Sequence, residues 1–404
     1  MDVYKAAKAI VEKLVSKGHI AYFAGGWVRD HLLGKPSSDI DIATSATPEQ
    51  VMALFPRTVP VGISFGVVLV VIGEHPFEVA TFRLDGGYVD GRRPESIELS
   101  TPEEDAIRRD FTINGMFYDP RTEHVYDYVE GRQDLQNKII RAIGNPHERF
   151  REDRLRMVRA VRFAARLDFA LDPDTEQAIV EHAPTLFPAV AMERIWQELV
   201  KIVENGRAAW AFVKMHELGL LQEIFPELKV VSNAEIKKME AAYARFPKEA
   251  PEIAWVVELF PEVSLEGQLA LCERLKISTA DSRFVLFLWE TRERVLRNEV
   301  GDVEWVYFYA DARAKLSLEV IAARMETGAS AAFLKAHLDR QGRLQAHIKR
   351  LQSKHPVVTS QMLRARGVTP GKLMGDLLRE AEKLAITRNL DSPEAILALL
   401  LPHP

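Results

Sequence analysis

The stretch Gly25-Gly26-Trp27-Val28-Arg29-Asp30, followed nine residues later by Asp39-Ile40-Asp41-Ile42, decides how the first part of this chain folds. The apolar run 20–24 precedes the two glycines, so the pattern predicts a strand that ends in a glycine turn and leads into a helix. In the second stretch, acids alternate with isoleucines. Because side chains alternate faces along a strand, we expect both aspartates on one face and both isoleucines in the core.

Together these two stretches predict a site for a nucleoside triphosphate and a divalent metal. Two carboxylates on one face, Asp39 and Asp41, repel each other unless a cation lies between them. Mg²⁺ is typically held by one or two carboxylates plus substrate phosphates. The backbone at Gly25 and Gly26 can approach phosphate without an intervening side chain. Arg29 can add a bidentate phosphate contact.

A third acid, Glu78, lies in the apolar segment 77–82, which is typical of a strand. On a strand beside the two aspartates, Glu78 could face the same metal, and a charged residue on an edge strand is an equally open interpretation. The sequence contains neither Gly-x-Gly-x-x-Gly nor Gly-Lys-Ser/Thr. It therefore matches neither the dinucleotide-binding fingerprint nor the P-loop.

Five motifs in a fixed order give the chain a resemblance to a known family. It resembles the tRNA nucleotidyltransferases and poly(A) polymerases of the bacterial type. The motifs are Gly25-Gly26-x-Val28-Arg29-Asp30, Asp39-Ile40-Asp41, Arg108-Arg109-Asp110-Phe111-Thr112-Ile113-Asn114, Glu152-Asp153-x-x-Arg156, and Glu193-Arg194 with Glu198.

The resemblance implies Mg²⁺-dependent transfer of nucleotides to an RNA 3′ end without a nucleic-acid template. It also implies a role for each matched residue. The metal ligands of the family fall on Asp39 and Asp41, its triphosphate contacts on Gly26, Arg29 and Arg109, its base-reading residues on Asp153 and Arg156, and further nucleotide contacts on Arg159 and Arg162.

The segment 149–166 is helical by pattern, and an arginine at every third position forms a slowly drifting stripe along it. A solvated face with ion pairs is one interpretation. We favour nucleotide contacts, because Glu152 and Asp153 are the only acids within this segment that can pair with its arginines. In the preceding motif, Asp110 can pair with an arginine or cap the following turn.

Asp153 and Arg156 suit the recognition of cytosine and adenine. A carboxylate accepts hydrogen bonds and a guanidinium donates them. Cytosine and adenine present an amino donor beside a ring-nitrogen acceptor, whereas uracil and guanine present a carbonyl beside a ring N–H. A wrong base would leave buried polar groups unpaired, at about 1–3 kcal/mol each. The pair would therefore imitate a template strand.

The fold class predicted for the chain is α+β. A small nucleotidyltransferase head with a mixed sheet is expected at 1–140, followed by a helical neck with the base-recognition helix at 141–205, a helical body at 206–270 and a helical, tRNA-binding tail at 271–404. The segment 84–104 is rich in glycine and charge and predicts a loop. Its residues Arg92 and Arg93 could make it a lid over the triphosphate, and a solvated insertion is the alternative.

The composition of the chain limits the kinds of partner that it can bind. The net charge of −5 is unusual for an RNA-binding protein, but the segment 335–372 holds nine lysines and arginines and a single acid, Asp339. This segment predicts contact with an RNA backbone, with a solvated helix as the alternative, and its few aromatic residues do not predict base stacking. There is no run of about 18 apolar residues and no signal-peptide pattern, so we expect no membrane association and a cytoplasmic location. The single cysteine, Cys272, is expected in the core.

The leading functional prediction is CCA synthesis or repair on tRNA from CTP and ATP. An enzyme that adds only A to tRNA ending in CC and a poly(A) polymerase are close alternatives. A non-catalytic RNA-binding protein is disfavoured by the intact pair Asp39 and Asp41, and a small-molecule nucleotidyltransferase by the long helical half.

Overall fold

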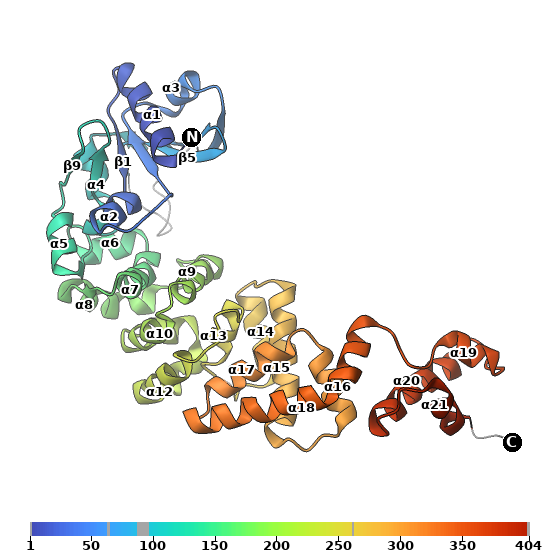
Figure 1. Cartoon of the computed structure of the whole chain (residues 1–404). Helices are drawn as coiled ribbons and strands as arrows, with labels where there is room; N and C mark the ends of the chain where they lie inside the picture. Colours follow the sequence, from blue (N-terminus) through green and yellow to red (C-terminus); the bar gives the residue numbers. More distant parts are fainter. Residues whose placement is uncertain (1, 63–64, 87–96, 261, 402–404) are drawn as a thin grey trace. The chain divides into compact units, whose positions relative to one another are not determined.

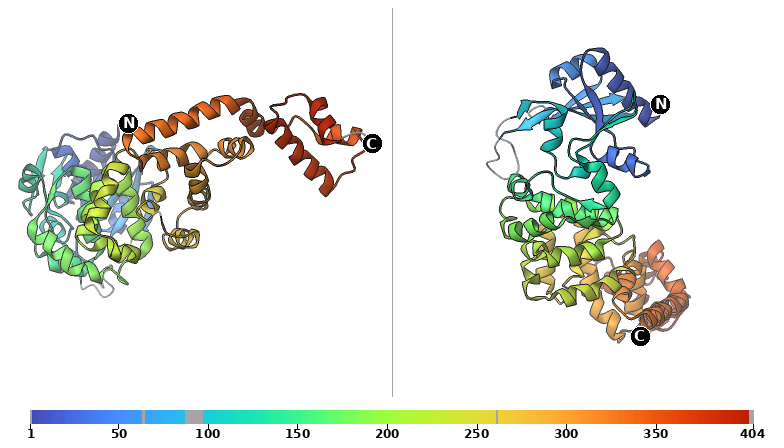
Figure 2. Two further views of the ribbon diagram at one scale, coloured as in Figure 1. Left: turned by 90° about the horizontal axis from the view of Figure 1, so that it is seen from below. Right: turned by 90° about the vertical axis from the view of Figure 1, so that its left-hand side faces the viewer.

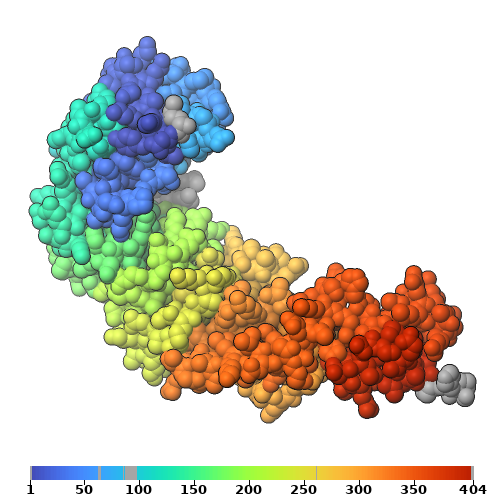
Figure 3. Space-filling view, in the orientation of Figure 1, coloured from blue at the N-terminus to red at the C-terminus, as the bar shows by residue number. Residues whose placement is uncertain are grey.

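The computed structural model describes residues 2–62, 65–86, 97–260 and 262–401, and the chain forms two compact units that divide between Lys237 and Lys238. Figure 1 labels the elements of both units, and Figure 3 shows their surfaces, from blue to green in the first and from yellow to red in the second. None of the described helices is both long and apolar enough to cross a membrane.

The first unit begins with a mixed seven-stranded sheet, in the order β3-β4-β5-β2-β1-β8-β9. Strands β2 and β5 are parallel and the other neighbours are antiparallel. The prediction of a mixed sheet in the head is therefore confirmed. The strands are β1 Ala21–Ala24, β2 Asp41–Thr44, β3 Thr58–Gly62, β4 Val67–Ile72, β5 His75–Thr81, β8 Phe117–Asp119 and β9 His124–Tyr126.

Strand pairing brings the glycine turn and the acids together. Ala24, the last residue of β1, pairs with Asp41, the first residue of β2, so Gly25 follows directly beside that carboxylate. On the other side of β2, Ile42 pairs with Val79 in parallel register, which places Glu78 next to Asp41. The isoleucines at 40 and 42 are buried, as predicted. Asp39 lies just before the strand rather than within it.

Helices cover the sheet. α1, Val3–Ser16, is amphipathic and buries Ala6, Ile10 and Leu14 against it. α3, Pro48–Leu54, packs on β4 and β5. α2, Gly26–Leu32, follows the glycine turn directly, so the predicted order of strand, turn and helix is also confirmed. Both views of Figure 2 show these elements in blue.

The segment 84–104 is more ordered at its ends than the sequence predicts. β6, Arg83–Asp85, and β7, Ile97–Leu99, form a two-stranded antiparallel sheet, and α4, Pro102–Ile107, starts with a capping box formed by Thr101 and Glu104. Prediction of a loop over the whole segment was therefore wrong, because pairing between two short strands leaves no clear periodicity in the sequence. The proposed lid residues Arg92 and Arg93 lie outside the described residues.

After the sheet, the first unit is mostly helical. Its remaining elements are the 3₁₀ helices η2 Thr112–Asn114, η3 Ala183–Thr185 and η4 Pro226–Val230, the parallel pair β10 Ile139–Ile140 and β11 Ala170–Leu171, and the helices α5 Gly131–Asn137, α6 Pro146–Glu152, α7 Leu155–Leu167, α8 Pro173–His182, α9 Met192–Glu204, α10 Ala208–Glu217 and α11 Leu220–Ile224.

The single helix predicted over 149–166 was wrong, because α6 ends at Glu152 and α7 begins at Leu155. At the break, Asp153 has extended backbone angles, φ −143° and ψ 104°. Its carboxylate accepts a hydrogen bond from the backbone N–H of Leu155 at 3.0 Å. An aspartate side chain that accepts a hydrogen bond from a backbone N–H at the start of a helix favours a new helix start over a continuous helix. The apolar periodicity alone does not reveal this.

The second unit is helical throughout its described residues. The helix α12 Asn233–Tyr243 crosses the boundary, and the others are α13 Glu252–Val257, α14 Leu265–Arg274, α15 Thr279–Arg297, α16 Asp302–Ala310, α17 Ala314–Ala323, α18 Thr327–Ser353, α19 Ser360–Ala365, α20 Lys372–Thr387 and α21 Pro393–Leu400. Cys272 is buried, as predicted.

The lysines and arginines of the basic segment 335–372 fall into two groups. Arg340, Arg343 and Arg350 donate hydrogen bonds to side chains of Asn298, Asp302 and Glu382 respectively. The other cations are exposed and form no hydrogen bond or ion pair with the described residues; they are Lys335, Lys349, Lys354, Arg364, Arg366 and Lys372.

Candidate active site

The glycine turn lies against two arginines, and a side chain at Gly25 would be strained as well as crowded. Gly25 has φ +66°, a left-handed conformation that favours glycine, and a Cβ there would lie 3.2 Å from Nη1 of Arg109. A Cβ on Gly26 would lie 3.6 Å from Nη2 of Arg29. The two arginines that the sequence assigned to triphosphate binding therefore lie directly against the turn.

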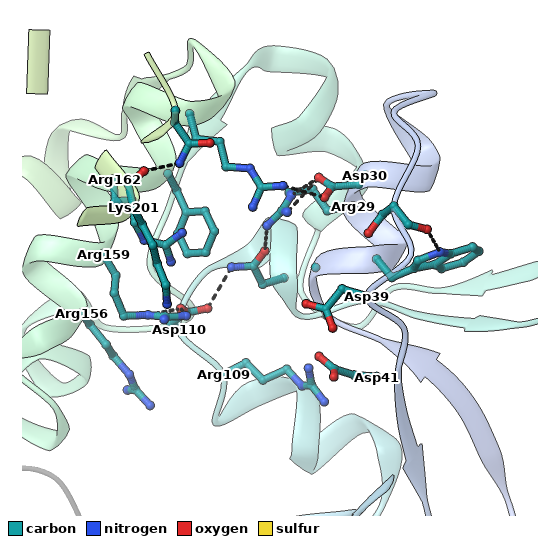
Figure 4. Close-up of a pocket in the computed structure, with 18 of the residues that line it drawn as sticks. Arg29, Asp30, Asp39, Asp41, Arg109, Asp110, Arg156, Arg159, Arg162 and Lys201 are labelled. Carbon is teal, nitrogen blue, oxygen red and sulfur yellow. Dashed lines mark hydrogen bonds and ion pairs between the residues drawn. The ribbon is translucent and has the colours of Figure 1, made fainter. Parts of the chain in front are cut away.

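Three carboxylates face one another beside this turn. Burial first, and then the charges of Asp39 and Glu78, raise the pKa of the Asp41 carboxyl from 3.8 to about 6, while Arg109 acts in the opposite direction. Among the described residues, the carboxylates of Asp39 and Asp41 form no hydrogen bond or ion pair. In Figure 4 their carboxylates lie close together, with Arg109 beside Asp41.

These two aspartates fit a divalent cation. Carboxylate oxygens are hard ligands, and the repulsion that raises the pKa of Asp41 would be relieved by a positive ion between the two groups. No cluster of three or more His, Cys, Asp or Glu side chains arranged to hold a metal occurs in the described ranges. The remaining metal ligands would therefore be substrate phosphates and water, and the role of Glu78 stays a proposal.

Arg29 is held by a buried hydrogen-bond chain. Its side chain is 2% exposed; Nε donates to Asp30 at 2.8 Å and Nη1 donates to Oδ1 of Asn114 at 2.7 Å. Burial lowers the pKa of Arg29, although the adjacent Asp30 opposes this effect. The amide of Asn114 in turn donates to Asp110 at 3.1 Å. Since every link is buried or partly buried, the Arg29 guanidinium is fixed before any ligand arrives.

The same chain continues into the arginine row of α7. Asp110 accepts two hydrogen bonds from Arg159, at 3.0 and 2.6 Å. Burial raises the pKa of the Asp110 carboxyl, but Arg159, aided by Asn114, outweighs burial and lowers it to about 2. Arg162 pairs with Glu198 of α9, whose other oxygen lies 3.7 Å from Arg159.

These partners correct the interpretation of the arginine stripe. We took Glu152 and Asp153 as the only acids available to it, but Asp110 and Glu198 pair with it from other elements. The reason is tertiary: α7 packs on α9, and Phe163 of α7 packs on Phe111 beside Asp110, so acids 36 and 49 residues away in sequence reach the arginines of α7. The stripe is therefore an ion-paired wall rather than a row of free cations.

The base-reading candidates are also held in place. Asp153 accepts a hydrogen bond from Arg194 at 2.8 Å. Arg156, 9% exposed, donates to Glu152 at 2.7 Å and to the carbonyl oxygen of Arg108 at 3.0 Å. A carboxylate offers about four lone-pair sites and a guanidinium five N–H donors. Both groups thus keep hydrogen-bonding capacity for a ligand while their positions are set.

Arg108 and Arg109 both bind Asp105, a residue that is 1% exposed. Arg108 Nη2 donates to one carboxylate oxygen at 2.6 Å and Arg109 Nη2 to the other at 2.9 Å. Arg109 also lies over the ring of Phe117, 5.0 Å from its centroid. The sequence favoured Arg109 alone as a site residue, whereas both arginines line the cavity.

Most of the residues described above line one cavity of about 990 Å³ in the first unit. It brings together every candidate that the sequence singled out: Gly25, Gly26, Arg29, Asp39, Asp41, Glu78, Arg109, Asp153, Arg156, Arg159 and Arg162. It also includes residues that the sequence did not single out as site residues, among them Asn114, Phe163, Arg166, Lys201 and Asn205. Lys201 and Asn205 are near the end of α9, and a helix with ordinary surface polarity gives no signal for them.

Comparisons with protein families match two parts of the first unit. Residues 21–141 match the model described as poly A polymerase head domain, which covers the sheet and the glycine turn. Residues 168–231 match the model described as probable RNA and SrmB-binding site of polymerase A.

Known relatives extend the match to nearly the whole chain. The CCA-adding enzyme of Enterococcus faecalis is 33% identical over 98% of this chain and 94% of its own length. That of Geobacillus stearothermophilus is 48% identical over 54% of each chain. Among solved structures, the CCA-adding enzyme of Bacillus stearothermophilus in complex with CTP superposes with a TM-score of 0.81 at 31% identity, over 99% of this chain and 97% of that one. The chain therefore belongs to the family of CCA-adding enzymes, tRNA nucleotidyltransferases built on the poly(A) polymerase head domain.

Proposed function

We propose that this protein adds CMP and AMP from CTP and ATP to the 3′ end of tRNA, without a nucleic-acid template and with Mg²⁺ as its metal. One observation carries the proposal. A single cavity holds two unpaired aspartates, a side-chain-free glycine turn with two arginines against it, and the pair Asp153 and Arg156.

The reaction is an in-line displacement at the α-phosphorus. The terminal RNA hydroxyl forms the new P–O bond, the bond to the β-phosphate oxygen breaks, and pyrophosphate leaves. Arg29 and Arg109 hold the triphosphate and balance the charge that develops on it. Asp39 and Asp41 would hold Mg²⁺, which would polarise the α-phosphate and lower the pKa of the attacking hydroxyl.

Base choice rests on the pair Asp153 and Arg156. Arg194 and Glu152 fix the two groups, so a base that presents its donor and its acceptor in the reverse order meets groups that do not rotate away. Arg159 and Arg162 complete the wall of the cavity beside the nucleotide. Discrimination then comes from unpaired buried groups on the wrong base rather than from steric exclusion.

Binding of the tRNA body is assigned to the second unit. The exposed cations of segment 335–372 can neutralise backbone phosphates. We retain the four-part division into head, neck, body and tail, at 1–140, 141–205, 206–270 and 271–404, as a proposal. Because CTP, ATP and tRNA are cytoplasmic substrates, we place the enzyme in the cytoplasm.

A substrate series tests the function. Three tRNAs that end in the discriminator base, in C, or in CC are each incubated with labelled CTP or ATP and Mg²⁺. We expect all three to be extended as far as CCA and no further. Extension of the CC end alone would instead identify an A-adding enzyme, and runs of A beyond the first would identify a poly(A) polymerase. Ca²⁺ in place of Mg²⁺ is the metal control.

A further inference from the structure

A second cavity, of about 390 Å³, lies within the second unit and shares no lining residue with the active site. Its walls come from α15, α16 and α20. Aromatic rings form much of its surface: Phe287 and Phe308 stack with centroids 5.7 Å apart and an interplanar angle of 7°, and Trp305 meets Phe308 edge-on at 5.8 Å. Tyr307 is 48% exposed. Sites for small ligands have volumes of roughly 300–1,000 Å³, so one flat ring with its substituents fits.

Two cations contribute to the lining of this aromatic surface. Arg294, on α15, is exposed and donates one long hydrogen bond of 3.4 Å to the carbonyl oxygen of Glu290. Lys383, on α20, is exposed and lies 3.7 Å from Glu380. The long contact of Arg294 is to a neutral carbonyl oxygen, and an exposed ion pair such as that of Lys383 contributes little to stability, so both cations are available to an anion. Glu304 is the single acid among the lining residues.

We propose that this aromatic cavity binds one unstacked nucleotide of the RNA substrate, with the base against Tyr307 and Phe308 and its phosphate near Arg294 and Lys383. The proposal rests on the proposed function, since it names a second contact for the same RNA. Stacking on aromatic side chains tolerates every base, so this contact adds affinity without sequence choice.

The charges favour an RNA nucleotide over other occupants. A free triphosphate carries more negative charge than two cations and one acid can balance. A buried protein helix would need a continuous apolar strip, whereas charged residues on two helices interrupt this lining. The helices α18 and α20, which carry part of segment 335–372, both pack on α16, the helix that supplies Trp305, Tyr307 and Phe308.

Binding measurements with two RNAs test the proposal. Whole tRNA ending in CC has unpaired loop bases, and a two-strand duplex of its acceptor stem with the same 3′ end has none beyond that end. We compare Tyr307→Ala with Leu296→Ala, an exposed residue of α15 outside the cavity, and Lys383→Ala with Lys315→Ala, an exposed lysine of α17. Tyr307→Ala should lower the ratio of duplex Kd to tRNA Kd about ten-fold. Lys383→Ala should reduce the salt dependence of tRNA binding by about one unit of log–log slope.

The outcomes separate this proposal from the proposed function. Unchanged ratios in Tyr307→Ala, with wild-type enzyme active on both RNAs, would overturn the cavity proposal alone. An unchanged ratio with a shift in the sedimentation of the free protein would overturn it in favour of a second copy as the occupant. If wild-type protein adds no nucleotide to either RNA, the proposed function fails, and the binding ratio still decides the cavity proposal.

Discussion

The glycine turn with its aspartates and the arginine row of α7 face the same cavity, but different kinds of contact build them. In the first region, neighbours in sequence become neighbours in space through one strand pairing, Ala24 with Asp41. In the second, each arginine depends on an acid from another element, such as Asp110 or Glu198. The negative charges of Asp39 and Asp41 beside the turn have no ion-pair partner among the described residues, as a metal site requires. The positive charges of the α7 arginines are already balanced by acids.

Loss of an unpaired carboxylate should therefore abolish chemistry without unfolding the protein. We expect Asp41→Asn to lower the rate of nucleotide addition roughly a thousandfold, because one of two metal ligands is removed. Single-turnover addition of AMP to tRNA ending in CC measures the effect. Glu78→Gln is the matched control on the neighbouring strand, and its activity decides whether Glu78 also binds metal. Retention of full activity by Asp41→Asn would contradict the metal assignment.

Loss of a compensating acid should instead destabilise the fold. Asp110→Asn leaves the Arg159 guanidinium without its closest counter-charge in a mostly buried position, and we expect a loss of about 3 kcal/mol in the free energy of unfolding. Urea denaturation of the purified protein measures it. Asp376→Asn, at an exposed ion pair, should change stability by less than about 0.5 kcal/mol. Equal losses in both variants would remove the distinction between the two regions.

Base choice should depend on the fixed pair at the break between α6 and α7. We expect Asp153→Ala combined with Arg156→Ala to keep triphosphate binding and to lose on the order of a hundredfold of the preference for CTP and ATP over UTP and GTP. Competition assays with all four nucleotides give the ratio. Glu152→Gln, which touches Arg156 from outside the cavity lining, serves as the control. If the double variant still rejects UTP and GTP, the base-reading assignment is wrong.

The smallest effect concerns pH. The pKa of Asp41 is about 6 in the fold against 3.8 for an unperturbed carboxyl, so ionised Asp41 destabilises the metal-free protein above pH 6 and has no such effect below pH 3.8. Asp41→Asn should raise stability at pH 7.5 by about 1 kcal/mol after solvent screening, and the gain should vanish near pH 4. Thermal melts in EDTA at the two pH values test this. A gain that does not change with pH would show that repulsion between the carboxylates is not its cause.

The difference between the two regions also explains what the sequence could predict. The turn was predictable because glycine conformation and strand alternation are local rules. The partners of Arg159 and Arg162 were not predictable, because tertiary packing, such as that of α7 on α9, determines which acids reach these arginines. The break at Asp153 was missed because the apolar period continues through it. Asp110 was expected to pair with an arginine, but only the fold selects Arg159.

The pairing of Ala24 with Asp41 has a consequence for how relatives diverge. The sheet, and not the length of the connection 33–40, sets the position of the acid beside the turn. Insertions or deletions before Asp39 in that connection can accumulate during evolution while Asp41 keeps its place. Searches for distant homologues should therefore allow a variable gap between the two stretches and demand instead that both border paired strands.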